Sequence, residues 1–426
     1  MISRVDLRGQ QPSPDALRAV LPRAELDVEV ALDVVRPLCE DVRTRGAAAV
    51  RDLTQRFDGV DLESTRVPAQ ALKDALAALD PALRAALEEA AGRTQLVHES
   101  QRRRDAVVEV SPGGTVTERW LPVRRVGLYV PGGLLAYPST VVMNVVPAQV
   151  AGVGSMAVAS PPRRDNGGLP HPSVLAACAL LGIEEVHAVG GAQAVAMFAY
   201  GTVDCAPADL VTGPGNIYVT SAKRALKGVI GIDSEAGPTE IAVLADDSAD
   251  PTFLAADLVA QAEHDPEARA LLITPNRRLA KEVAVAVRVQ AAGNAIALAS
   301  LARKGAIIVT RDAGDAMRLA NELAPEHLVV ENEAMAREVR AAGSVFVGRW
   351  SAQAAGDYAI GSNHVLPTAG AARFRGGLNT ADFVRLISVQ RLTHQGLARL
   401  APTVTTLARA EGLEAHARSI EVRTTR

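Results

Sequence analysis

Three groups of imidazole, carboxylate and amide side chains stand in the second half of the sequence at spacings that suit a metal ion. They are Gln261 with His264, Asp357 with His364, and Glu411 with His416. Gln261 and His264 lie three residues apart in a helical pattern, which places them on one helix face. Nitrogen and oxygen ligands without sulfur suit a zinc or manganese ion that exchanges ligands with a substrate. Taken alone, the Gln261–His264 pair is explained more simply as a solvated helix end.

An adjacent acid and imidazole, Glu326 and His327, follow Pro325 at the predicted end of a helix. The proline is expected to stop the helix and to expose both side chains just before a strand. Such a pair suits general acid and base catalysis. An ordinary surface turn explains the same two residues equally well when they are taken alone.

Three glycine-containing turns each follow an apolar run that is typical of a strand. They occupy residues 131–133, 190–193 and 213–216. In an open parallel sheet such turns lie at the carboxyl edge, where the next helix offers free N–H groups to an anion. Each turn alone is weak evidence, and for three on one edge a nucleotide site and a set of ordinary turns explain the residues equally well. A fourth glycine segment, 152–157, precedes a strand, so we interpret it as a helix-to-strand turn.

Short apolar runs alternate with helical patterns from about residue 124 onwards, as expected for parallel sheets covered by helices. The first series of predicted strands occupies 126–130, 156–159, 185–189 and 210–212, with helices near 172–182, 192–200 and 216–229. The second series occupies 241–244, 270–274, 306–310, 328–330 and 344–347. We therefore predict an α/β fold with two consecutive Rossmann-like parallel-sheet domains.

The same patterns divide the chain into four parts. Residues 1–118 show helical apolar spacing and form an N-terminal helical region. Residues 119–236 form the first α/β domain, which contains the glycine turns. Residues 237–370 form the second, which carries the metal and catalytic residues. Residues 371–426 form a helical C-terminal tail that is too short to fold alone and must dock elsewhere.

Composition limits the classes of function. The 426 residues are 48% hydrophobic with a formal net charge of -3, which permits a large core and argues against nucleic acid or an anionic membrane as the main partner. We find neither a signal-peptide pattern nor about eighteen consecutive apolar residues, so we expect a cytoplasmic protein with a small-molecule ligand. The three cysteines are widely spaced, so we expect no thiolate metal site.

Nine short stretches resemble the histidinol dehydrogenase family, in the family's order and through most of the chain. They are YVPGG at 129–133, GGAQA at 190–194, GPGN at 213–216, GPTE at 237–240, QAEH at 261–264, APEHL at 324–328, GDY at 356–358, GSNHVLPT at 361–368 and EGLEAH at 411–416. Chance agreement at so many separated points is not credible.

The resemblance implies an enzyme that oxidises L-histidinol through L-histidinal to L-histidine, with reduction of two NAD per turnover, at the end of histidine biosynthesis. It implies one zinc ion per subunit with the ligands Gln261, His264, Asp357 and His416. The zinc would hold the imidazole and amino nitrogens of the substrate as a template. His327 would accept the alcohol proton, and Glu326 would activate the water that hydrates the aldehyde.

The resemblance also implies contacts to substrate and cofactor. Substrate contacts fall on Thr239, Gln261, His264, His327, Asp357, His364, Glu411 and His416, and cofactor contacts fall on Tyr129, Gln193 and Asn216. Thr239 departs from the serine that is more usual in the family; it keeps the hydroxyl and adds a methyl group. Family members are homodimers in which the C-terminal tail of one subunit completes the site of the other, and here Glu411 and His416 lie on that tail.

Two alternatives stay open at this point. A related zinc-dependent NAD dehydrogenase that acts on another amino alcohol or diol would keep Glu326 and His327 as well. A zinc-holding protein without catalysis would be expected to have lost that pair.

Overall fold

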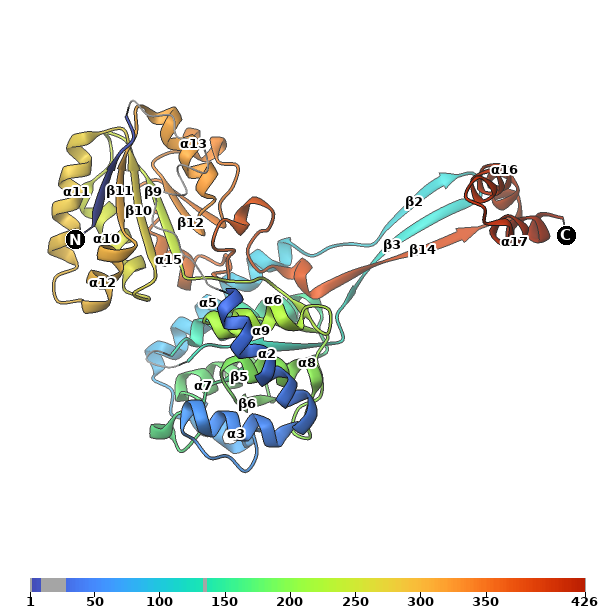
Figure 1. Ribbon diagram of the computed structural model, residues 1–426, viewed down its shortest axis with the longest axis horizontal. Coiled ribbons are helices and arrows are strands. Elements are labelled where there is room, and N and C mark those ends of the chain that lie inside the picture. Colours follow the sequence, from blue (N-terminus) through green and yellow to red (C-terminus); the bar gives the residue numbers. More distant parts are fainter. Residues whose placement is uncertain (1, 9–27, 133–135, 426) are drawn as a thin grey trace.

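Two α/β units and a long arm make up the molecule (Figure 1). The computed structural model describes residues 2–8, 28–132 and 136–425, so residues 9–27 of the predicted helical region and Gly133 of the first glycine turn lie outside the described residues. Each unit is built on a parallel sheet, which confirms the predicted α/β class with two consecutive parallel-sheet domains. Among the described residues, no helix combines the length and the apolar character needed to cross a membrane.

The lower unit in Figure 1 contains a five-stranded parallel sheet in the order β6-β5-β4-β7-β8. Its strands are β4 (Arg125–Tyr129), β5 (Ser155–Ser160), β6 (Val186–Ala188), β7 (Leu210–Thr212) and β8 (Gly231–Ile232). One face is covered by α2 (Val28–Arg45), α3 (Ala47–Asp58), α8 (Gly191–Tyr200) and α9 (Ile217–Leu226). The other face is covered by α4 (Ala69–Ala77), α5 (Pro81–Ser100), α6 (Pro138–Ala151) and α7 (Pro172–Leu180).

The central strand β4 shows how this unit is packed. Val126 and Leu128 pack in the cluster formed with α6 and α7, while Tyr129 packs on the opposite side with α8, because successive side chains of a strand point to opposite faces. A Cβ atom at Gly127 would lie 2.4 Å from Phe198 Cγ. Glycine at this position therefore allows α8 to approach the sheet closely.

The upper unit in Figure 1 contains a six-stranded parallel sheet in the order β1-β11-β10-β9-β12-β13. Its strands are β1 (Ser3–Asp6), β9 (Glu240–Leu244), β10 (Arg269–Thr274), β11 (Ala306–Val309), β12 (His327–Val330) and β13 (Ser344–Val347). The helices α10 (Pro251–Ala262), α11 (Arg277–Gln290) and α12 (Ala295–Arg303) cover one face. The helices α13 (Ala313–Leu323) and α14 (Glu333–Glu338) cover the other, and α15 (Gln353–Tyr358) follows β13.

The predicted strands of both series are present, within one or two residues of their expected bounds. The predicted turn at 152–157 is also confirmed, because Gly152 ends α6 with a φ of 85° just before β5. The start of the chain differs from the prediction. Residues 3–6 do not belong to a helical region but form β1, which pairs with β11 of the second unit.

The arm is the second feature that differs from the sequence-based prediction. An antiparallel sheet in the order β14-β3-β2 carries the last two helices away from both units (Figure 1). Its elements are β2 (Ala106–Ser111), β3 (Gly114–Pro122), β14 (Val384–Leu392), α16 (His394–Ala410) and α17 (Glu414–Thr424). Helical structure was therefore wrongly predicted for residues 384–392 of the C-terminal tail, which form β14, and for residues 106–118. Their β-branched residues, interrupted by a turn at Gly113 with a φ of 82°, form a hairpin instead.

Candidate active site

Glu326 and His327 lie at the amino edge of the six-stranded sheet, at the start of β12. Pro325 follows the end of α13, as predicted, but both side chains are buried, with exposed fractions of 6% and 3%. The expected exposure was therefore wrong, and so was the alternative of a surface turn. Glu326 Oε2 accepts hydrogen bonds from Thr239 Oγ1 at 2.6 Å and from the Glu240 backbone N–H at 2.8 Å.

Burial changes the protonation of this pair. Loss of hydration raises the pKa of Glu326 to about 7. Burial alone would lower the pKa of His327, but the charges of Glu326 and Asp357 and the bond to the Glu240 carbonyl outweigh it and raise that pKa to about 9. Glu326 can therefore exchange a proton close to neutral pH, whereas His327 in the metal-free chain is mostly protonated there.

The two ring nitrogens of His327 have different roles. Nδ1 donates to the backbone carbonyl of Glu240 at 3.0 Å and lies 3.7 Å from Glu326 Oε2. Nε2 lies 3.6 Å from Asp357 Oδ1 and has no hydrogen-bond partner among the described residues. The Nδ1–H bond fixes the ring and the tautomer, so Nε2 is the nitrogen that can accept a proton from a ligand.

Two of the four predicted metal ligands, Gln261 and Asp357, lie next to this pair, and His264 follows Gln261 by three residues. Gln261, at the end of α10, donates from Nε2 to Thr239 Oγ1 at 2.6 Å, and its buried Oε1 has no hydrogen-bond partner among the described residues. His264 donates from Nδ1 to the Ala260 carbonyl at 3.0 Å, so its Nε2 is the candidate ligand atom. His327 holds the pKa of Asp357 below its usual value, although burial acts in the opposite direction.

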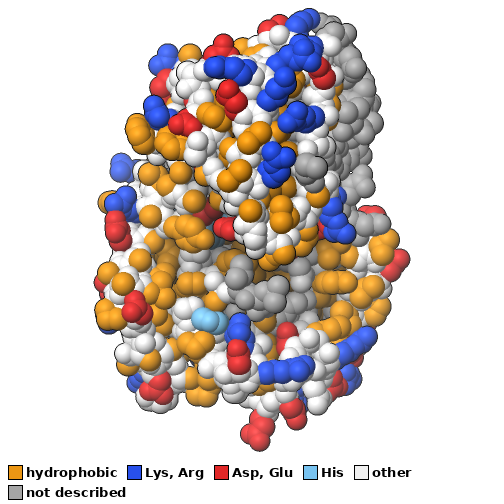
Figure 2. Space-filling model, turned by 90° about the vertical axis from the view of Figure 1, so that its left-hand side faces the viewer, with side chains coloured by type: hydrophobic (Ala, Val, Ile, Leu, Met, Phe, Trp, Pro, Cys, Tyr) orange, Lys and Arg blue, Asp and Glu red, His pale blue; other side chains and the backbone are white. Residues whose placement is uncertain are grey.

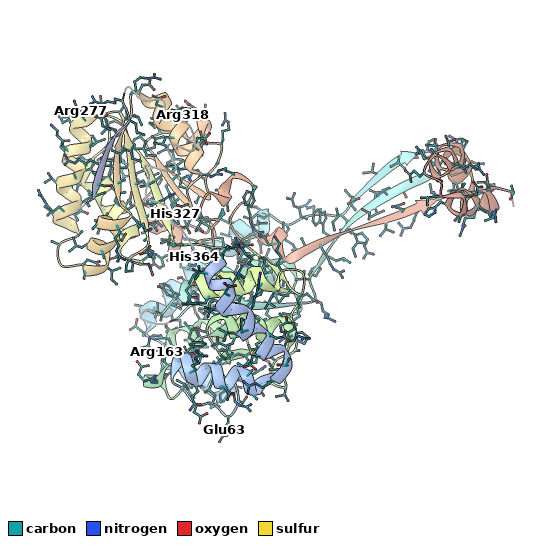
Figure 3. All side chains as sticks on the ribbon, viewed as in Figure 1. Glu63, Arg163, Arg277, Arg318, His327 and His364 are labelled. Atoms are coloured by element: carbon teal, nitrogen blue, oxygen red, sulfur yellow. The ribbon has the colours of Figure 1, made fainter. Side chains whose placement is uncertain are left out.

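His364 connects the site to the other unit. Its Nδ1 donates to the Asp357 carbonyl at 2.7 Å, and its Nε2 lies 3.2 Å from Oγ1 of Thr140 in α6. Figure 3 shows His327 and His364 at the junction of the two units, and Figure 2 shows a hollow between the units. The site thus lies between the amino edge of one sheet and the helices of the other unit.

The predicted cofactor residues all lie at the carboxyl edge of the five-stranded sheet. The hydroxyl of Tyr129 accepts the Gly191 N–H at 3.1 Å, and Asn216 caps α9 by accepting two backbone N–H groups. Tyr129 and Gln193 are buried. Gly213, with a φ of 115°, begins the third turn; a Cβ there would lie 2.0 Å from the Tyr129 carbonyl oxygen, so only glycine fits.

Glu411 and His416 are not near the other predicted site residues within one chain. Both are exposed, at the end of α16 and the start of α17. The arm places these helices at the opposite end of the molecule from the junction of the two units (Figure 1). A single chain therefore brings together Gln261, His264 and Asp357 but not His416.

Comparisons with known proteins decide the family. The family model described as histidinol dehydrogenase matches residues 21–424. Histidinol dehydrogenases from Streptomyces avermitilis and Thermobifida fusca are each 55% identical, over 99% of this chain and 98% of their own lengths. The crystal structure of histidinol dehydrogenase from Elizabethkingia anophelis has a TM-score of 0.92 at 32% identity and covers 100% of this chain and 98% of its own.

The chain belongs to the histidinol dehydrogenase family. Members of this family are NAD-dependent oxidoreductases. The nine stretches that carried the resemblance thus reflect a relationship that extends along nearly the whole chain.

Two buried ion pairs of this histidinol dehydrogenase family member were missed from the sequence. Glu240 and Arg269, the first residues of β9 and β10, pair directly beside Glu326 and His327. Lys223 Nζ pairs with Asp233 at 2.6 Å and donates to the Gly213 carbonyl, while Asp233 accepts the Gly213 N–H at 2.8 Å. The second pair holds the glycine turn from both sides. Charged residues at the starts of two predicted strands were the available signal for the first pair.

A second cluster with metal-ligand side chains lies at the amino edge of the five-stranded sheet. Atoms of Glu185, His187 and Cys205 lie within 4.8 Å of one another. Arg125, however, donates to both Glu185 oxygens at 2.6 and 3.0 Å, and His187 bonds Thr65 and Glu185 through its two nitrogens. Burial also raises the pKa of Cys205 to about 11. In this family member the cluster is a buried ion-pair network whose ligand atoms already have partners.

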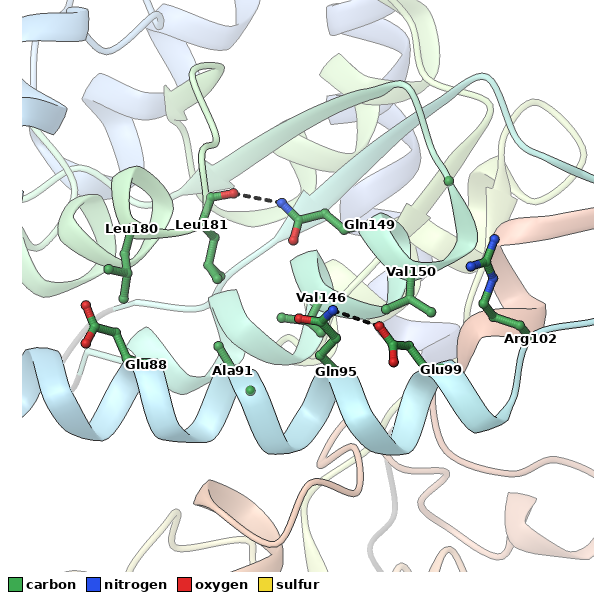
Figure 4. A pocket seen from close by; sticks show the side chains of 12 residues that line it. Glu88, Ala91, Gln95, Glu99, Arg102, Val146, Gln149, Val150, Leu180 and Leu181 are labelled. Carbon is green, nitrogen blue, oxygen red and sulfur yellow. Dashed lines mark hydrogen bonds between the residues drawn. The ribbon is translucent and has the colours of Figure 1, made fainter.

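A surface groove of about 620 Å³ lies between α5, α6 and α7 (Figure 4). Its polar lining includes Glu88, Glu99, Arg102 and Gln149. It contains none of the predicted catalytic, cofactor or metal residues. The groove therefore does not coincide with the predicted site residues among the described parts of the chain.

The network around Glu185 makes the free energy of unfolding depend on pH in the acidic range. Burial alone would raise the pKa of Glu185, but hydrogen bonds from His187 and Arg125 outweigh it and lower that pKa from about 4.5 to about 2. The stabilisation is therefore complete above about pH 4.5 and is lost as the pH falls toward 2. Glu185→Gln should lower stability at pH 7 by roughly 1–2 kcal/mol, less than for a fully buried pair because the Glu185 side chain is partly exposed. Urea unfolding midpoints at several pH values measure this.

The exposed neighbour provides the control for that experiment. Glu184→Gln changes the same chemical group outside the network and should leave the midpoint unchanged. The difference between the Glu185 variant and the native chain should shrink below about pH 4.5. Equal midpoints for the native chain and Glu185→Gln at pH 7 would show that the network does not stabilise the fold.

Proposed function

We propose that this chain is a zinc-dependent histidinol dehydrogenase of the cytoplasm. It oxidises L-histidinol through L-histidinal to L-histidine and reduces two NAD in the last steps of histidine biosynthesis. The observation that carries the proposal is the buried pair of Glu326 and His327, set beside three amide, imidazole and carboxylate side chains in a chain of this family. Two oxidations need proton acceptance twice and water attack once, and this pair provides suitable groups.

His327 accepts the alcohol proton in the first step. Bound NAD would take the hydride from the substrate carbon, and His327 Nε2 accepts the hydroxyl proton, so that the alcohol becomes an aldehyde. The bond from Nδ1 to the Glu240 carbonyl keeps Nε2 unprotonated in the neutral ring. After that proton has passed to solvent, the same nitrogen accepts the hydroxyl proton of the hydrated aldehyde in the second oxidation.

Glu326 removes a proton from the water that attacks the aldehyde carbon. The bonds from Thr239 and Glu240 both end on Oε2, so we assign the proton acceptor to Oε1. A pKa of about 7 suits this task, since the ionised form is available near neutrality and the proton is readily passed on. The methyl group of Thr239 does not disturb its hydroxyl, which makes both of its hydrogen bonds at 2.6 Å.

The described residues fit a zinc ion. Gln261 offers a buried oxygen without a hydrogen-bond partner, and Asp357 and His264 supply carboxylate and imidazole atoms without sulfur. Zinc bound there would hold the imidazole and amino nitrogens of histidinol and would add positive charge that lowers the pKa of His327 toward neutrality. Tyr129, Gln193 and Asn216 are proposed to bind NAD at the carboxyl edge of the first sheet.

A homodimer with shared sites supplies the remaining residues. Thr239 and His364 are proposed substrate contacts in one subunit, and Glu411 and His416 reach the site from the other. The arm supports this arrangement because it carries exposed apolar side chains that a second copy would cover. They include Val107, Val108, Val110, Leu386, Leu392, Leu407 and Leu413.

Purified protein should release two NADH for each L-histidinol consumed, and removal of zinc by a chelator should abolish turnover until zinc is restored. Absorbance of NADH against a limiting amount of histidinol gives the ratio. Other amino alcohols and simple diols serve as competitor substrates. Faster turnover of one of these than of histidinol would favour the related dehydrogenase instead.

Glu326→Gln should slow the second oxidation more than the first, because only the second needs water attack. With L-histidinal as substrate, kcat for its oxidation should fall by about 10²–10⁴-fold. Reduction of histidinal to histidinol by NADH, which uses no water, should be largely retained. Glu322→Gln, on the exposed surface of α13, is the matched control. An equal loss in both directions would contradict the assignment of Glu326 to the water.

Shared sites can be tested by mixing two inactive variants, His327→Gln and His416→Ala. Each hybrid dimer would contain one site with an intact His327 from one chain and an intact His416 from the other. Co-expression in equal amounts should restore about a quarter of the native activity, because half of the dimers are hybrids with one working site. Absence of recovery in isolated hybrids would mean that each chain uses its own tail.

A further inference from the structure

Gln353, the first residue of α15, contacts two elements that carry proposed zinc ligands. Its side chain is buried, with an exposed fraction of 1%, and Nε2 donates to Asp357 Oδ2 at 2.6 Å. The two residues lie four apart, so the bond closes one turn of α15 on the side that faces the site. The amide therefore fixes the carboxylate of a proposed ligand without occupying a ligand position itself.

The main chain of Gln353 makes a second connection, to α10. α15 packs against α10, and the backbone N–H of Gln353 acts to lower the pKa of Asp257, which burial raises to about 6 and which lies four residues before Gln261 on α10. Asp257 and Gln261 thus share one helix face. Gln353 consequently links the helix that carries Gln261 and leads to His264 with the helix that carries Asp357.

The amide oxygen of Gln353, Oε1, which is buried and has no hydrogen-bond partner among the described residues, indicates the function of this side chain. A buried acceptor without a partner is unfavourable, and an apolar side chain of similar size would avoid that loss. Packing alone therefore does not explain a glutamine here, whereas the donor bond to Asp357 does.

That bond also selects one oxygen of Asp357. Oδ2 is held by Gln353, while Oδ1 lies 3.6 Å from His327 Nε2, on the side of the catalytic pair. A carboxylate held through one oxygen presents the other in a defined direction, which is the usual task of a residue that contacts a metal ligand.

We infer that Gln353 is a positioning residue for the zinc centre. With Asp257 it holds α15 against α10, so that Asp357 Oδ1 is presented to the same cation as Gln261 and His264. This inference rests on the proposed function, because it requires Asp357 to be a zinc ligand. Gln353 itself touches neither the substrate nor the metal.

The test compares zinc binding by full-length protein that carries Gln353→Met, which keeps the length of the side chain and loses the donor. Competition with a chromogenic chelator should show zinc affinity about 10–100-fold weaker than in the native chain. Cobalt substituted for zinc should give a changed visible spectrum, which reports the altered coordination. The melting temperature of the metal-free variant should stay close to that of the metal-free native chain. Because the variant binds zinc more weakly, zinc should raise its melting temperature less than it raises that of the native chain.

Two further variants make each outcome decisive. Gln55→Met, the same substitution on the exposed surface of α3, should change neither zinc affinity nor the cobalt spectrum. If Gln353→Met does not fold, Gln353→Asn, which keeps an amide but is too short to reach Asp357, should show the same loss of affinity. Unchanged zinc affinity and an unchanged cobalt spectrum in a folded Gln353 variant would overturn the inference.

Asp357→Asn separates this inference from the proposed function. If Asp357→Asn weakens zinc binding and Gln353→Met does not, the zinc site stands and the positioning role fails. If Asp357→Asn leaves zinc affinity unchanged, Asp357 is not a ligand and the proposed metal centre fails together with the role of Gln353.

Discussion

The proposed site depends on the two hydrogen bonds that fix the Glu326 carboxylate. Its Oε2 takes hydrogen bonds from Thr239 and from the Glu240 backbone, both at the start of β9. Those two donors offset part of the free energy of hydration that the buried carboxylate loses. The parallel pairing of β12 with β9, in which His327 lies opposite Ile241, sets the distances within the group. Strand register therefore places the acid and the imidazole, and no flexible loop is needed to hold them.

Sequence patterns predicted the two parallel sheets well, because their strands are continuous apolar runs that are buried on both faces. The arm was missed because its strands are exposed on at least one side and contain arginine and glutamate among the valines and threonines. Strand β1 was missed for another reason. Four residues are too few to show a period, and their partner, β11, lies about 300 residues later.

The identities of the site residues were more predictable than their surroundings. Glu326 and His327 were recognised as an acid and a base, but their burial depends on contacts with β9 that lie 86 and 87 residues away in the chain. The role of Gln353 was not visible for the same reason, since a glutamine one turn before Asp357 looks like any polar residue until its burial is known. The local sequence shows which residue types could act as acid or base. Their burial and their pKa values depend on contacts with segments that lie far away in the chain.

The arm also decides where additions to this chain are harmless. His416 and the carboxyl end of the chain are separated by about two and a half turns of α17. In the proposed dimer a purification tag or fused domain at that end would lie close to the partner's catalytic residues and would narrow access to its hollow. The amino end leaves from β1, an edge strand of the six-stranded sheet (Figure 1). Fusions, labels and surface attachment are therefore better tolerated there.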